Sequence, residues 1–599
     1  MILQALAALY DRLAAMDRPQ VAQIGFAPQG ISACLVLDQD GTVAGLEDMR
    51  ERAPRGHRMI PVDRIVPDYG EKRTSRDRPN LLWDNTEYVF GVSKDPKDAK
   101  RAERRFKDFR DLHLRELAQL DDPAVEALRL FLIAWSPDRY RSLPYADEFV
   151  GGNIVFRLND PRLYLHDCPA ARNAWMRLYE KRESTPGICL VTGRHAQIAR
   201  LHPAIKGVRD PGGQAEKGIV AINKDKDAFD SYGKKQSYNA PVGVVTAAKY
   251  SAALNHLLAD DAQHKVIADT TIVWWTDRPT EIEDLFGNLL DSGGVAQDAV
   301  LADRIRRLIE QIREISPLGA VPDASVPFYL LGLSPSTSRI IIRCWLDSSV
   351  AELAGRLKQH FADLDMTGTH VDDIPPSLGE LVGETVIASS KTKLPDYDRV
   401  APQLSGEILS AVLRGSLYPA ELYCGVLRRI RAEGFADRDR RKDWMRSMYR
   451  RAAILKACLQ RRYRLMKTGK EIPVSLDTAR TDAAYLLGRL FAALEKVQEE
   501  SAEGKLNRTV KDSYFGSASA TPATLFPRLL RLSHHHQRKL RQSRPHRAVY
   551  FDRLLQEVMS PMGAIPRILS VEDQGVFYIG YYHQRQDFFA RKEQPENGK

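Results

Sequence analysis

Residues 223–241, NKDKDAFDSYGKKQSYNAP, combine lysines, aromatic rings and side-chain amides in one short stretch. Lysines attract phosphate over long distances, a tyrosine ring can carry an unstacked base, and Gln or Asn amides match the edge of adenine. Gly233 permits a tight turn in which backbone can approach a groove closely. The same composition also fits a solvated loop between a strand at 217–222 and a helix from about residue 244, because loops are generally polar. Both interpretations stay open on composition alone.

Catalytic motifs are absent from the sequence. It contains no G-x-x-x-x-G-K-[ST] phosphate loop, no G-x-S-x-G elbow and no H-E-x-x-H pair. His166 and Asp167 resemble the doublet of metal phosphohydrolases, but a metal site needs further ligands. His195 and His202 lie seven residues apart, where a polar or phosphate-facing role is favoured. The sequence therefore predicts a binding protein with no catalytic residue, metal or cofactor. The alternative is a metal-dependent nuclease that uses His166, Asp167 and His202.

The net charge is +10, and the basic residues are concentrated in the C-terminal third. Residues 421–470 contain 16 lysines and arginines against 5 acidic residues, and residues 501–550 contain 10 against 2. The rest of the chain is therefore net negative. This asymmetry indicates a polyanionic partner, most often a nucleic acid. Anionic lipid is the other candidate, but the basic helices carry an apolar stripe suited to packing and no lipid-anchor signal.

The overall composition is that of a soluble globular protein, with 599 residues, 43% hydrophobic and 28% charged. This length allows several domains. No apolar run approaches the ~18 residues that span a bilayer, so no membrane association is expected. The first 16 residues predict an amphipathic helix rather than a signal peptide. Six scattered cysteines without a CxxC pair favour a reducing cytoplasm.

The first 375 residues mix strands and helices without a regular βαβ period, which predicts an α+β architecture. Candidate strands are 32–38, 86–92, 187–192, 218–223 and 270–276, with a pair at 327–333 and 338–346. Candidate helices are 123–135, 244–258 and 297–315. Asp40 and Gly41 after the first strand form a hairpin signal.

Beyond a loop-rich passage at 367–398, the sequence predicts a bundle of helices. One apolar stripe recurs at helical spacing and indicates core packing: Trp444, Met448, Leu455, Leu459 and Met466. The opposite face carries Arg446, Arg450, Arg461, Arg464 and Lys467. A second helix is expected at 484–497, with Asp477 and Thr478 as caps. Helices at 523–541 and 550–559 complete the predicted bundle.

Several separated segments carry a family resemblance that runs nearly end to end. They include MILQALAALYDRL at the start, PNLLWDNTEYVFG (79–91), CLVTGRHAQIARLHPAIKGV (189–208), residues 223–241, FYLLGLSPSTSRIIIRCWL (328–346), DTARTDAAYLLGRLFAALEKVQ (477–498) and QGVFYIGYYHQRQDFF (574–589). In this order they resemble the large subunit of the type I-C CRISPR surveillance complex, Cascade.

The resemblance implies a subunit that is not itself a nuclease. It would sit at the crRNA 5′ end, read a short PAM in double-stranded DNA, promote duplex opening and hold the displaced single strand of the R-loop. Implied partners are the crRNA, the backbone, crRNA-end and small subunits of Cascade, and a helicase-nuclease recruited in antiviral defence.

The resemblance also implies a domain division. An α+β body at 1–375 would recognise the PAM and dock into the complex, and a C-terminal helical bundle at 376–599 would resemble the Cascade small subunit. Members of this family also yield a separate small subunit from an internal start. Here that start would lie near Met466 or Val474, so that the product would be residues 474–599 if Val474 is used.

PAM recognition needs few base contacts on a duplex whose phosphates fix the register. Loops 73–80 and 231–239 offer amides or hydroxyls with cations behind them. The residues predicted to face bases are Asn80, Tyr232, Lys234, Gln236, Tyr238 and Asn239, with Tyr232 or Tyr238 as a wedge at the first unpaired step. The predicted phosphate contacts are Arg76, Arg78, Arg194, Lys206 and Lys235.

The basic helices are predicted to form the surface that tracks the non-target strand. Its residues would be Arg446, Arg450, Arg461, Arg464, Arg538, Lys539, Arg541 and Arg544. His534, His535 and His536 adjoin the second group and are interpreted as part of the same cationic surface. A third possibility is a general RNA- or DNA-coating protein that joins no complex.

Overall fold

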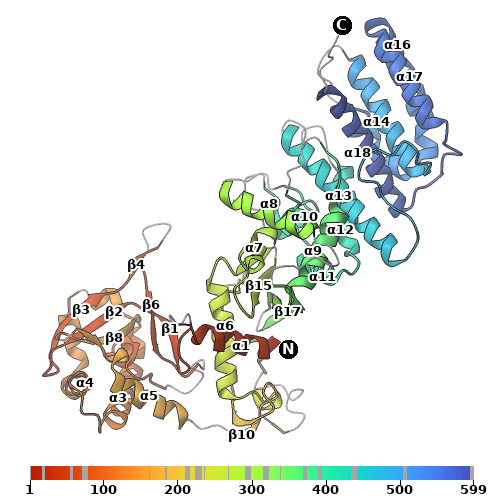
Figure 1. Ribbon diagram of the computed structural model, residues 1–599. Helices are drawn as coiled ribbons and strands as arrows, with labels where there is room; N and C mark the ends of the chain where they lie inside the picture. The colour runs from red at the N-terminus through yellow and green to blue at the C-terminus, as the bar shows by residue number, and fades with distance from the viewer. Residues whose placement is uncertain are drawn as a thin grey trace. The chain divides into compact units, whose positions relative to one another are not determined.

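The computed structural model describes most of the chain. The described residues are 2–16, 21–53, 59–70, 78–144, 146–160, 162–181, 185–208, 216–222, 233–234, 236–267, 269–290, 299–314, 323–336, 339–368, 374–388, 394–401, 403–432, 441–502 and 509–593. They form an α+β structure in which small sheets lie in the N-terminal half and many helices follow (Figure 1), as the sequence predicts. Among the described helices, none is both long and apolar enough to cross a membrane.

The chain divides into two compact units. Unit 1 contains Met1–Ala259 and Ser336–Ile340, and unit 2 contains Asp260–Pro335 and Ile341–Lys599. The division predicted after residue 375 thus falls inside unit 2. Residues before that point share a hydrophobic core with the C-terminal helices, because helix α9 (Val350–Leu364) packs on α11 (Leu404–Arg414) and α13 (Arg441–Leu465).

The main sheet of unit 1 has the strand order β3-β2-β8-β7, with β9 paired to β8. Its strands are β2 (Ala33–Leu37), β3 (Val43–Asp48), β7 (Trp83–Asn85), β8 (Asn153–Leu158) and β9 (Leu163–Tyr164). Gly41 has a φ of +80° in the turn between β2 and β3, which confirms the predicted hairpin. The sheet shares a core with the helices α3 (Ala99–Glu116), α4 (Pro123–Ala134) and α5 (Pro169–Glu180).

Small ribbons and two further helices complete unit 1. The ribbons pair β1 (Phe26–Ile31) with β6 (Val62–Pro67), β4 (Glu51–Arg52) with β5 (Met59–Ile60), β10 (Thr185–Ile188) with β11 (His195–Ile198), and β12 (Ile205–Lys206) with β13 (Glu216–Lys217). Helix α1 (Ile2–Ala14) packs on α6 (Val244–Ala259), and both match the helices expected from the sequence.

Three strand predictions in unit 1 need correction. Residues 86–92 were expected to form a strand, but a short helix, α2 (Thr86–Val89), occupies this position. The side chain of Asn85 accepts a hydrogen bond from the backbone N–H of Glu87 at 3.0 Å, and this cap starts the helix. Of the strand predicted at 187–192, only its first residues lie in β10. In the predicted strand 218–223, Gly218 forms only an isolated bridge with Arg339, and residue 223 lies outside the described residues.

The sheet of unit 2 has four strands in the order β14-β15-β16-β17. They are β14 (His264–Ile267), β15 (Thr270–Thr276), β16 (Pro327–Pro335) and β17 (Ile340–Ser349). One face shares a core with α7 (Glu281–Leu290), α8 (Ala299–Glu314) and α9, through side chains such as Trp274 and Phe328. The predictions of the strand at 270–276, of the pair at 327–333 and 338–346, and of the helix at 297–315 are confirmed to within a few residues.

Helices make up the rest of unit 2. Besides α11 and α13 they are α10 (Leu378–Gly383), α12 (Ala420–Ala432), α14 (Ala483–Ser501), α15 (Val510–Ala520), α16 (Pro522–Ser543), α17 (Pro545–Met559) and α18 (Val571–Glu593). The N-cap of α14 is Asp482, whose carboxylate accepts from the backbone of Ala484, and not the predicted Asp477 or Thr478.

The tightest helix contact in the bundle lies between α14 and α18, which run side by side (Figure 1). It depends on two glycines. A Cβ on Gly488 would overlap the carbonyl oxygen of Phe577, and one on Gly580 would overlap that of Tyr485. The two backbones therefore touch directly, and α14 is buried over most of its length.

Candidate nucleic-acid interfaces

The first predicted base-facing loop, 231–239, ends against the β10–β11 hairpin. The backbone N–H of Leu190 donates to the carbonyl oxygen of Pro241 at 2.9 Å, and that of Ala199 donates to Val242 at 2.9 Å. Helix α6 begins directly afterwards, at Val244. These bonds hold the end of the loop between the two sides of the hairpin.

The side-chain amides of Asn239 and Gln236 form hydrogen bonds within unit 1. The side-chain amide of Asn239 donates to the carbonyl oxygens of Lys234 at 2.7 Å and Gln236 at 3.0 Å. The side-chain oxygen of Gln236 accepts from Arg200 Nη1 at 2.6 Å. Gln236 also has a φ of +50°, which is uncommon for a residue with a side chain. Gln236 and Asn239 would have to exchange these internal bonds to contact a base.

The remaining predicted residues of this loop fall into two groups. Lys234 is exposed and Tyr238 is half-buried. Tyr232 and Lys235 lie outside the described residues. Of the predicted base-facing residues in this loop that the structure describes, Lys234 is therefore the most exposed.

In the second predicted loop, 73–80, only the last residues are described, and Arg76 lies outside them. The exposed guanidinium of Arg78 stacks 3.3 Å from the centre of the Tyr69 ring. Asn80 is half-buried, and its backbone N–H donates to Asp84 Oδ2 at 2.9 Å. Stacking on the ring of Tyr69 thus fixes the orientation of the Arg78 side chain, one of the predicted phosphate contacts.

The structure brings Arg78 and Lys206 to the same end of the β1–β6 ribbon. Lys206 is exposed, and its Nζ donates to the carbonyl oxygen of Pro28 in β1 at 3.4 Å. Tyr69, which carries Arg78, follows β6 by two residues. Arg194 is also exposed, but it lies at the turn of the β10–β11 hairpin. Two of the five predicted phosphate contacts are therefore associated with this ribbon.

The prediction that Arg461 belongs to a basic surface is wrong. Its side chain is fully buried, with Nε donating to Asp363 Oδ2 at 2.9 Å and Nη1 donating to the carbonyl oxygen of Ala411 at 2.9 Å. Arg464 donates to both oxygens of Asp363, at 2.8 and 3.0 Å. Lys456, also buried, donates to the last carbonyl oxygens of α9. These cations of α13 fasten it to the C-terminal end of α9.

Other predicted surface cations of α13 are also engaged within the chain. Arg450 forms an ion pair with Glu380, and the neighbouring Arg451 is buried against Glu384 at 2.8 Å. Arg446 is exposed. Much of the positive charge of α13 is therefore balanced by carboxylates of α9 and the α10 end.

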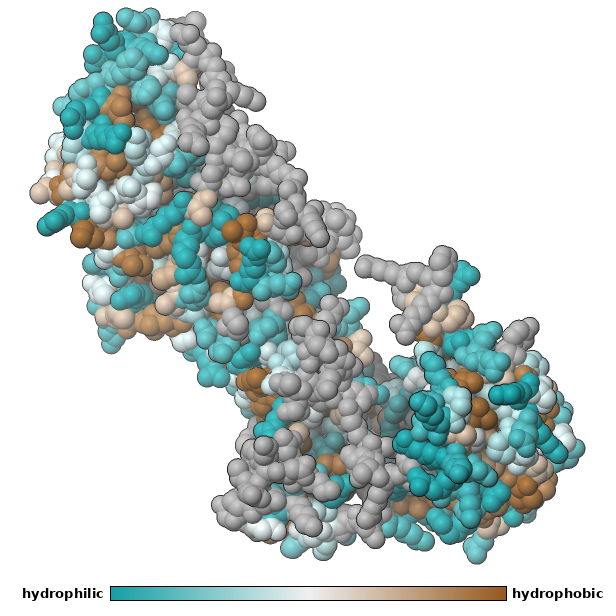
Figure 2. All heavy atoms as spheres, turned by 180° about the vertical axis from the view of Figure 1, so that it is seen from behind, coloured by the Kyte–Doolittle hydropathy of each residue, from teal (hydrophilic) through white to brown (hydrophobic). Residues whose placement is uncertain are grey.

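Helix α16 presents its cations to solvent. Arg538, Lys539, Arg541 and Arg544 are all exposed, as are Arg528, Arg531, His534 and His535. Residues 528, 531, 535 and 538 are three or four apart and so share one face of the helix. Within the part of the chain that the structure describes, Arg541 pairs with Asp552 at 2.8 Å, and no carboxylate pairs with Arg538 or Lys539. Seen from behind, the surface at this end of the bundle is largely hydrophilic (Figure 2).

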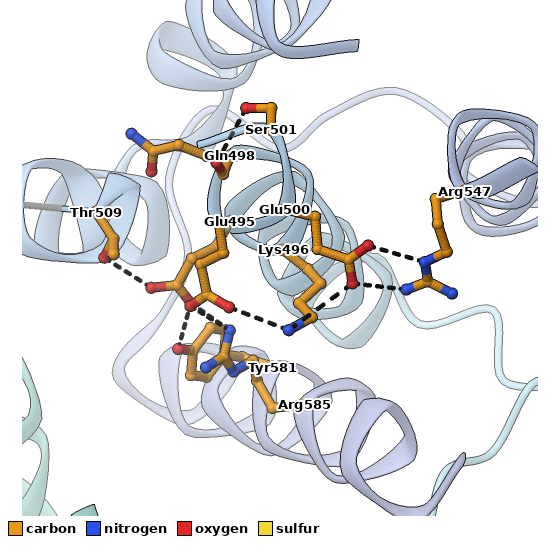
Figure 3. A network of polar contacts seen from close by, with 10 residues as sticks. Glu495, Lys496, Gln498, Glu500, Ser501, Thr509, Arg547, Tyr581 and Arg585 are labelled. Carbon is orange, nitrogen blue, oxygen red and sulfur yellow. Dashed lines mark hydrogen bonds and ion pairs between the residues drawn. The ribbon is translucent and has the colours of Figure 1, made fainter. Parts of the chain in front are cut away.

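A buried polar network holds the helices behind this surface (Figure 3). Glu495 on α14 accepts hydrogen bonds from Tyr581 at 2.6 Å and from Thr509 at 2.8 Å, and it lies 3.5 Å from Arg585 of α18. At the same end of α14, Arg547 of α17 donates to both oxygens of Glu500, at 2.8 and 2.6 Å.

The charges of this network favour its ionised form. Burial raises the pKa of Glu500, but the hydrogen bonds and charge of Arg547 outweigh burial and leave that pKa lowered. Burial lowers the pKa of Arg585, and Glu499 and Glu495 raise it above its ordinary value. The network fixes α17, and with it the turn that follows α16.

The histidines of the nuclease alternative contact different elements. His166 is buried 3.9 Å from Asp167, and burial lowers its pKa. Nδ1 of His202 lies 2.7 Å from the hydroxyl of Tyr250 on α6, and burial lowers the pKa of His202 to about 4. Within the described ranges, no three His, Cys, Asp or Glu side chains are grouped as metal ligands.

The carboxylates that neutralise α13 could not be identified from the sequence. Asp363, Glu380 and Glu384 precede their partners on α13 by 67 to 101 residues, and nothing in their local pattern marks them as its partners. The four-residue spacing of Glu380 and Glu384 is the one feature of the sequence that could have indicated a shared basic partner, because residues four apart share a helix face.

A family of known proteins matches nearly the whole chain. The model of the family described as CRISPR-associated protein (Cas_Csd1) matches residues 6–589. No curated protein matches the chain.

Proposed function

Because the chain belongs to the Cas_Csd1 family of CRISPR-associated proteins, we propose that it is the non-catalytic, DNA-binding large subunit of a crRNA-guided type I-C Cascade. In this role it recognises the PAM, promotes duplex opening and stabilises the displaced strand of the R-loop. Its partners are the crRNA and the other Cascade subunits, and it helps to recruit the helicase-nuclease in the cytoplasm.

The exposed cations of α16 are the observation that carries the DNA-binding part of this proposal. A row of arginines and lysines, of which Arg541 has a described carboxylate partner and Arg538 and Lys539 have none, attracts phosphates in any sequence. Sequence-independent contact is what holding a displaced strand requires. The helical segment from residue 474 contains this surface together with α14–α18, which supports its proposed likeness to a small subunit.

PAM reading is assigned to unit 1, where exposed cations lie beside half-buried amides. Arg78 and Lys206 are placed to hold phosphate, and Lys234 stands at the tip of the loop 231–239. Asn239 keeps that tip folded, so it acts on PAM choice through the position of its neighbours. Gln236 is the residue proposed to contact a base edge after releasing Arg200.

A PAM-library binding assay on the assembled complex tests this assignment. Gln236→Gly removes the amide while suiting the positive φ of this position, and it is expected to relax PAM preference. Losing one good base contact reduces discrimination by roughly 1–3 kcal/mol. Lys206→Ala, at an exposed predicted phosphate contact, is the matched control, which is expected to weaken all sequences alike. Unchanged preference in Gln236→Gly would exclude Gln236 as a PAM reader.

The absence of catalysis is part of the proposal and has its own test. The full-length protein is incubated with Mg²⁺ or Mn²⁺ and labelled DNA, and no cleavage is expected. Cleavage that disappears in His166→Ala would instead support the nuclease alternative. Co-purification of a defined crRNA with several other subunits would separate the proposal from a general coating protein.

A further inference from the structure

A cavity of about 120 Å³ opens among three helices of the C-terminal bundle in unit 2. Its walls come from α14, α17 and α18, and the connection that precedes α14 contributes Leu476 and Thr478. An engineered cavity of about 150 Å³ in another protein holds one benzene ring, so this volume suits a ligand with a single ring. None of the residues assigned above to a nucleic-acid interface lines the cavity.

The guanidinium of Arg489 brings an unused donor to the inner side of the cavity. Arg489 is only 1% exposed, and its Nε donates to Gln584 Oε1 at 3.0 Å while Nη2 donates to Glu557 Oε1 at 2.8 Å. These two bonds fix the plane of the guanidinium. Among the described residues, no acceptor lies within hydrogen-bond distance of Nη1. A ligand that carries an acceptor can therefore use this preoriented donor.

The charges that line the cavity balance one another. The lining contains two cations and two carboxylates: Arg489, Arg553, Glu557 and Asp587. The side chain of Glu557 is half exposed, and Arg489 is its only hydrogen-bond donor among the described residues. Glu557 can therefore accept a further bond. A lining without excess charge that offers both donors and acceptors favours a neutral polar ligand over a phosphate.

The remaining walls are apolar and one of them is held in place. Leu476, Tyr550 and Leu554 line the cavity between its polar groups. Arg547 lies 4.7 Å from the centre of the Tyr550 ring, and Arg547 is itself bonded to Glu500 (Figure 3). The ring of Tyr550 is thus positioned before a ligand enters. Apolar walls with a few oriented polar groups are typical of a small-ligand site.

We propose that this cavity binds an unstacked pyrimidine base of single-stranded DNA. A pyrimidine is one neutral planar ring, and its edge carries carbonyl oxygens beside an N–H or amino group. A carbonyl oxygen accepts from Arg489 Nη1, and the N–H or amino group donates to Glu557. A purine has two fused rings and exceeds the volume. The inference rests on the proposed function, because a displaced strand supplies unstacked bases, and it adds a preference for base size that phosphate contacts on α16 do not provide.

Blocking the exposed side of the cavity tests the proposal without changing a buried residue. Thr478 is exposed and lines the cavity, so Thr478→Trp places a large side chain at its mouth. Fluorescence anisotropy of the full-length protein compares labelled oligothymidylate with a strand of abasic residues of equal length. We expect Thr478→Trp to weaken oligothymidylate binding about fivefold or more and to leave the abasic strand unchanged, because only the first strand has bases to lose.

The neighbouring residue provides a matched control. Ala479 is exposed as well but does not line the cavity, so Ala479→Trp adds the same side chain beside the mouth. Both strands should bind Ala479→Trp as they bind the unmodified protein. Equal oligothymidylate affinity of the two tryptophan variants overturns the proposal. So does a loss of oligodeoxyadenylate binding in Thr478→Trp as large as the loss of oligothymidylate binding.

Photo-crosslinking locates the base independently of affinity. An oligothymidylate with one 4-thiothymidine is irradiated in complex with the full-length protein, and the crosslinked peptide is identified by mass spectrometry. Crosslinks are expected within residues 550–557 of the unmodified protein and of Ala479→Trp, and they should be lost in Thr478→Trp. Crosslinks confined to α16 exclude the cavity and leave the proposed DNA-binding surface intact. If the unmodified protein bound neither strand, the proposed DNA-binding function would be contradicted together with this inference.

Discussion

Helices α13 and α16 are both rich in arginine and lysine, but their cations lie in opposite surroundings. In α13, Arg461 is fully buried against Asp363, and Arg450 pairs with Glu380. In α16, Arg538 and Lys539 are exposed and have no carboxylate partner among the described residues. The first group holds the protein together, and the second is available to an external anion.

The role of a basic helix therefore depends on carboxylates elsewhere in the chain. A buried cation contributes to stability only where its charge is matched, and an exposed cation contributes most to phosphate binding where no carboxylate holds it tightly. Substitutions in the two helices should therefore affect different measurements.

Asp363→Asn should destabilise unit 2 strongly. Arg461 would remain buried without a carboxylate, and breaking a buried pair in this way typically costs about 3–5 kcal/mol of unfolding free energy. Urea denaturation of the full-length protein measures the change. Asp552→Asn breaks the exposed pair with Arg541 and serves as the matched control, with less than about 1 kcal/mol expected. Equal effects of the two variants would contradict the contrast between the helices.

The triple variant Arg531→Gln, Arg538→Gln and Lys539→Gln should weaken single-stranded DNA binding with little loss of stability. Each lost phosphate contact reduces the slope of log K against log salt by about 0.7, so the slope should fall by about 2. Affinity at low salt is expected to fall about tenfold or more. Filter binding between low and high salt measures both quantities.

A single substitution on α13 provides the control for that experiment. Arg462 is exposed on α13 and lies 3.7 Å from Glu572. Arg462→Gln removes one positive charge outside the α16 face, and the salt slope is expected to stay near that of the unmodified protein. If Arg462→Gln lowered the salt slope by as much per removed charge as the α16 variant does, DNA binding would depend only on the net charge of the protein.

The ion pair between Arg547 and Glu500 should make stability depend on acid pH. The pKa of Glu500 is lowered in the folded protein, so its contribution is present above the unfolded pKa of about 4.3 and is lost as pH falls through the folded value. The melting temperature of the unmodified protein should exceed that of Glu500→Gln at pH 6. This difference should shrink as the pH is lowered from 5 to 3. A constant difference across that range would contradict the assignment.

Arg541→Gln should give the smallest change in stability. Its pair with Asp552 is exposed at the surface, where such pairs contribute about 1 kcal/mol or less. Removing one of several phosphate contacts should still reduce DNA affinity a few-fold. Arg541→Gln thus shows whether this side chain contributes to DNA affinity, to stability, or to both. A clear fall in melting temperature with unchanged DNA affinity would show that Arg541 stabilises the fold, like the cations of α13, and does not bind DNA.

Elements with a strong local pattern could be predicted from the sequence. The apolar strand at 270–276 and the helix at 244–258 agree with β15 and α6, because hydrophobic periodicity reflects burial directly. The helix at 484–497 is found as well, although α14 extends beyond it at both ends. The α+β class follows from the order of such elements.

The environment of the candidate residues could not be predicted in the same way. Residues 86–92 contain β-branched and aromatic side chains typical of a strand, yet the cap provided by Asn85 makes the first of them helical. Arg461 lies on a helix face that the sequence pattern predicts to be basic and exposed. Its partner Asp363 is 98 residues away in the sequence, so the pairing is not visible locally. Gln236 and Asn239 have the amides of a base-reading loop, but these amides bond within unit 1.

The glycine contact between α14 and α18 also constrains the order in which the bundle forms during synthesis. Gly488 and Gly580 can meet only after α18 has left the ribosome, and α18 begins about 70 residues after α14 ends. At roughly 5–20 residues per second, α14 waits on the order of ten seconds for this partner. During that interval the face of α14 that packs on α18 has no permanent cover, although α15, α16 and α17 pack on other parts of α14. The uncovered face exposes the nascent chain to aggregation until α18 is complete.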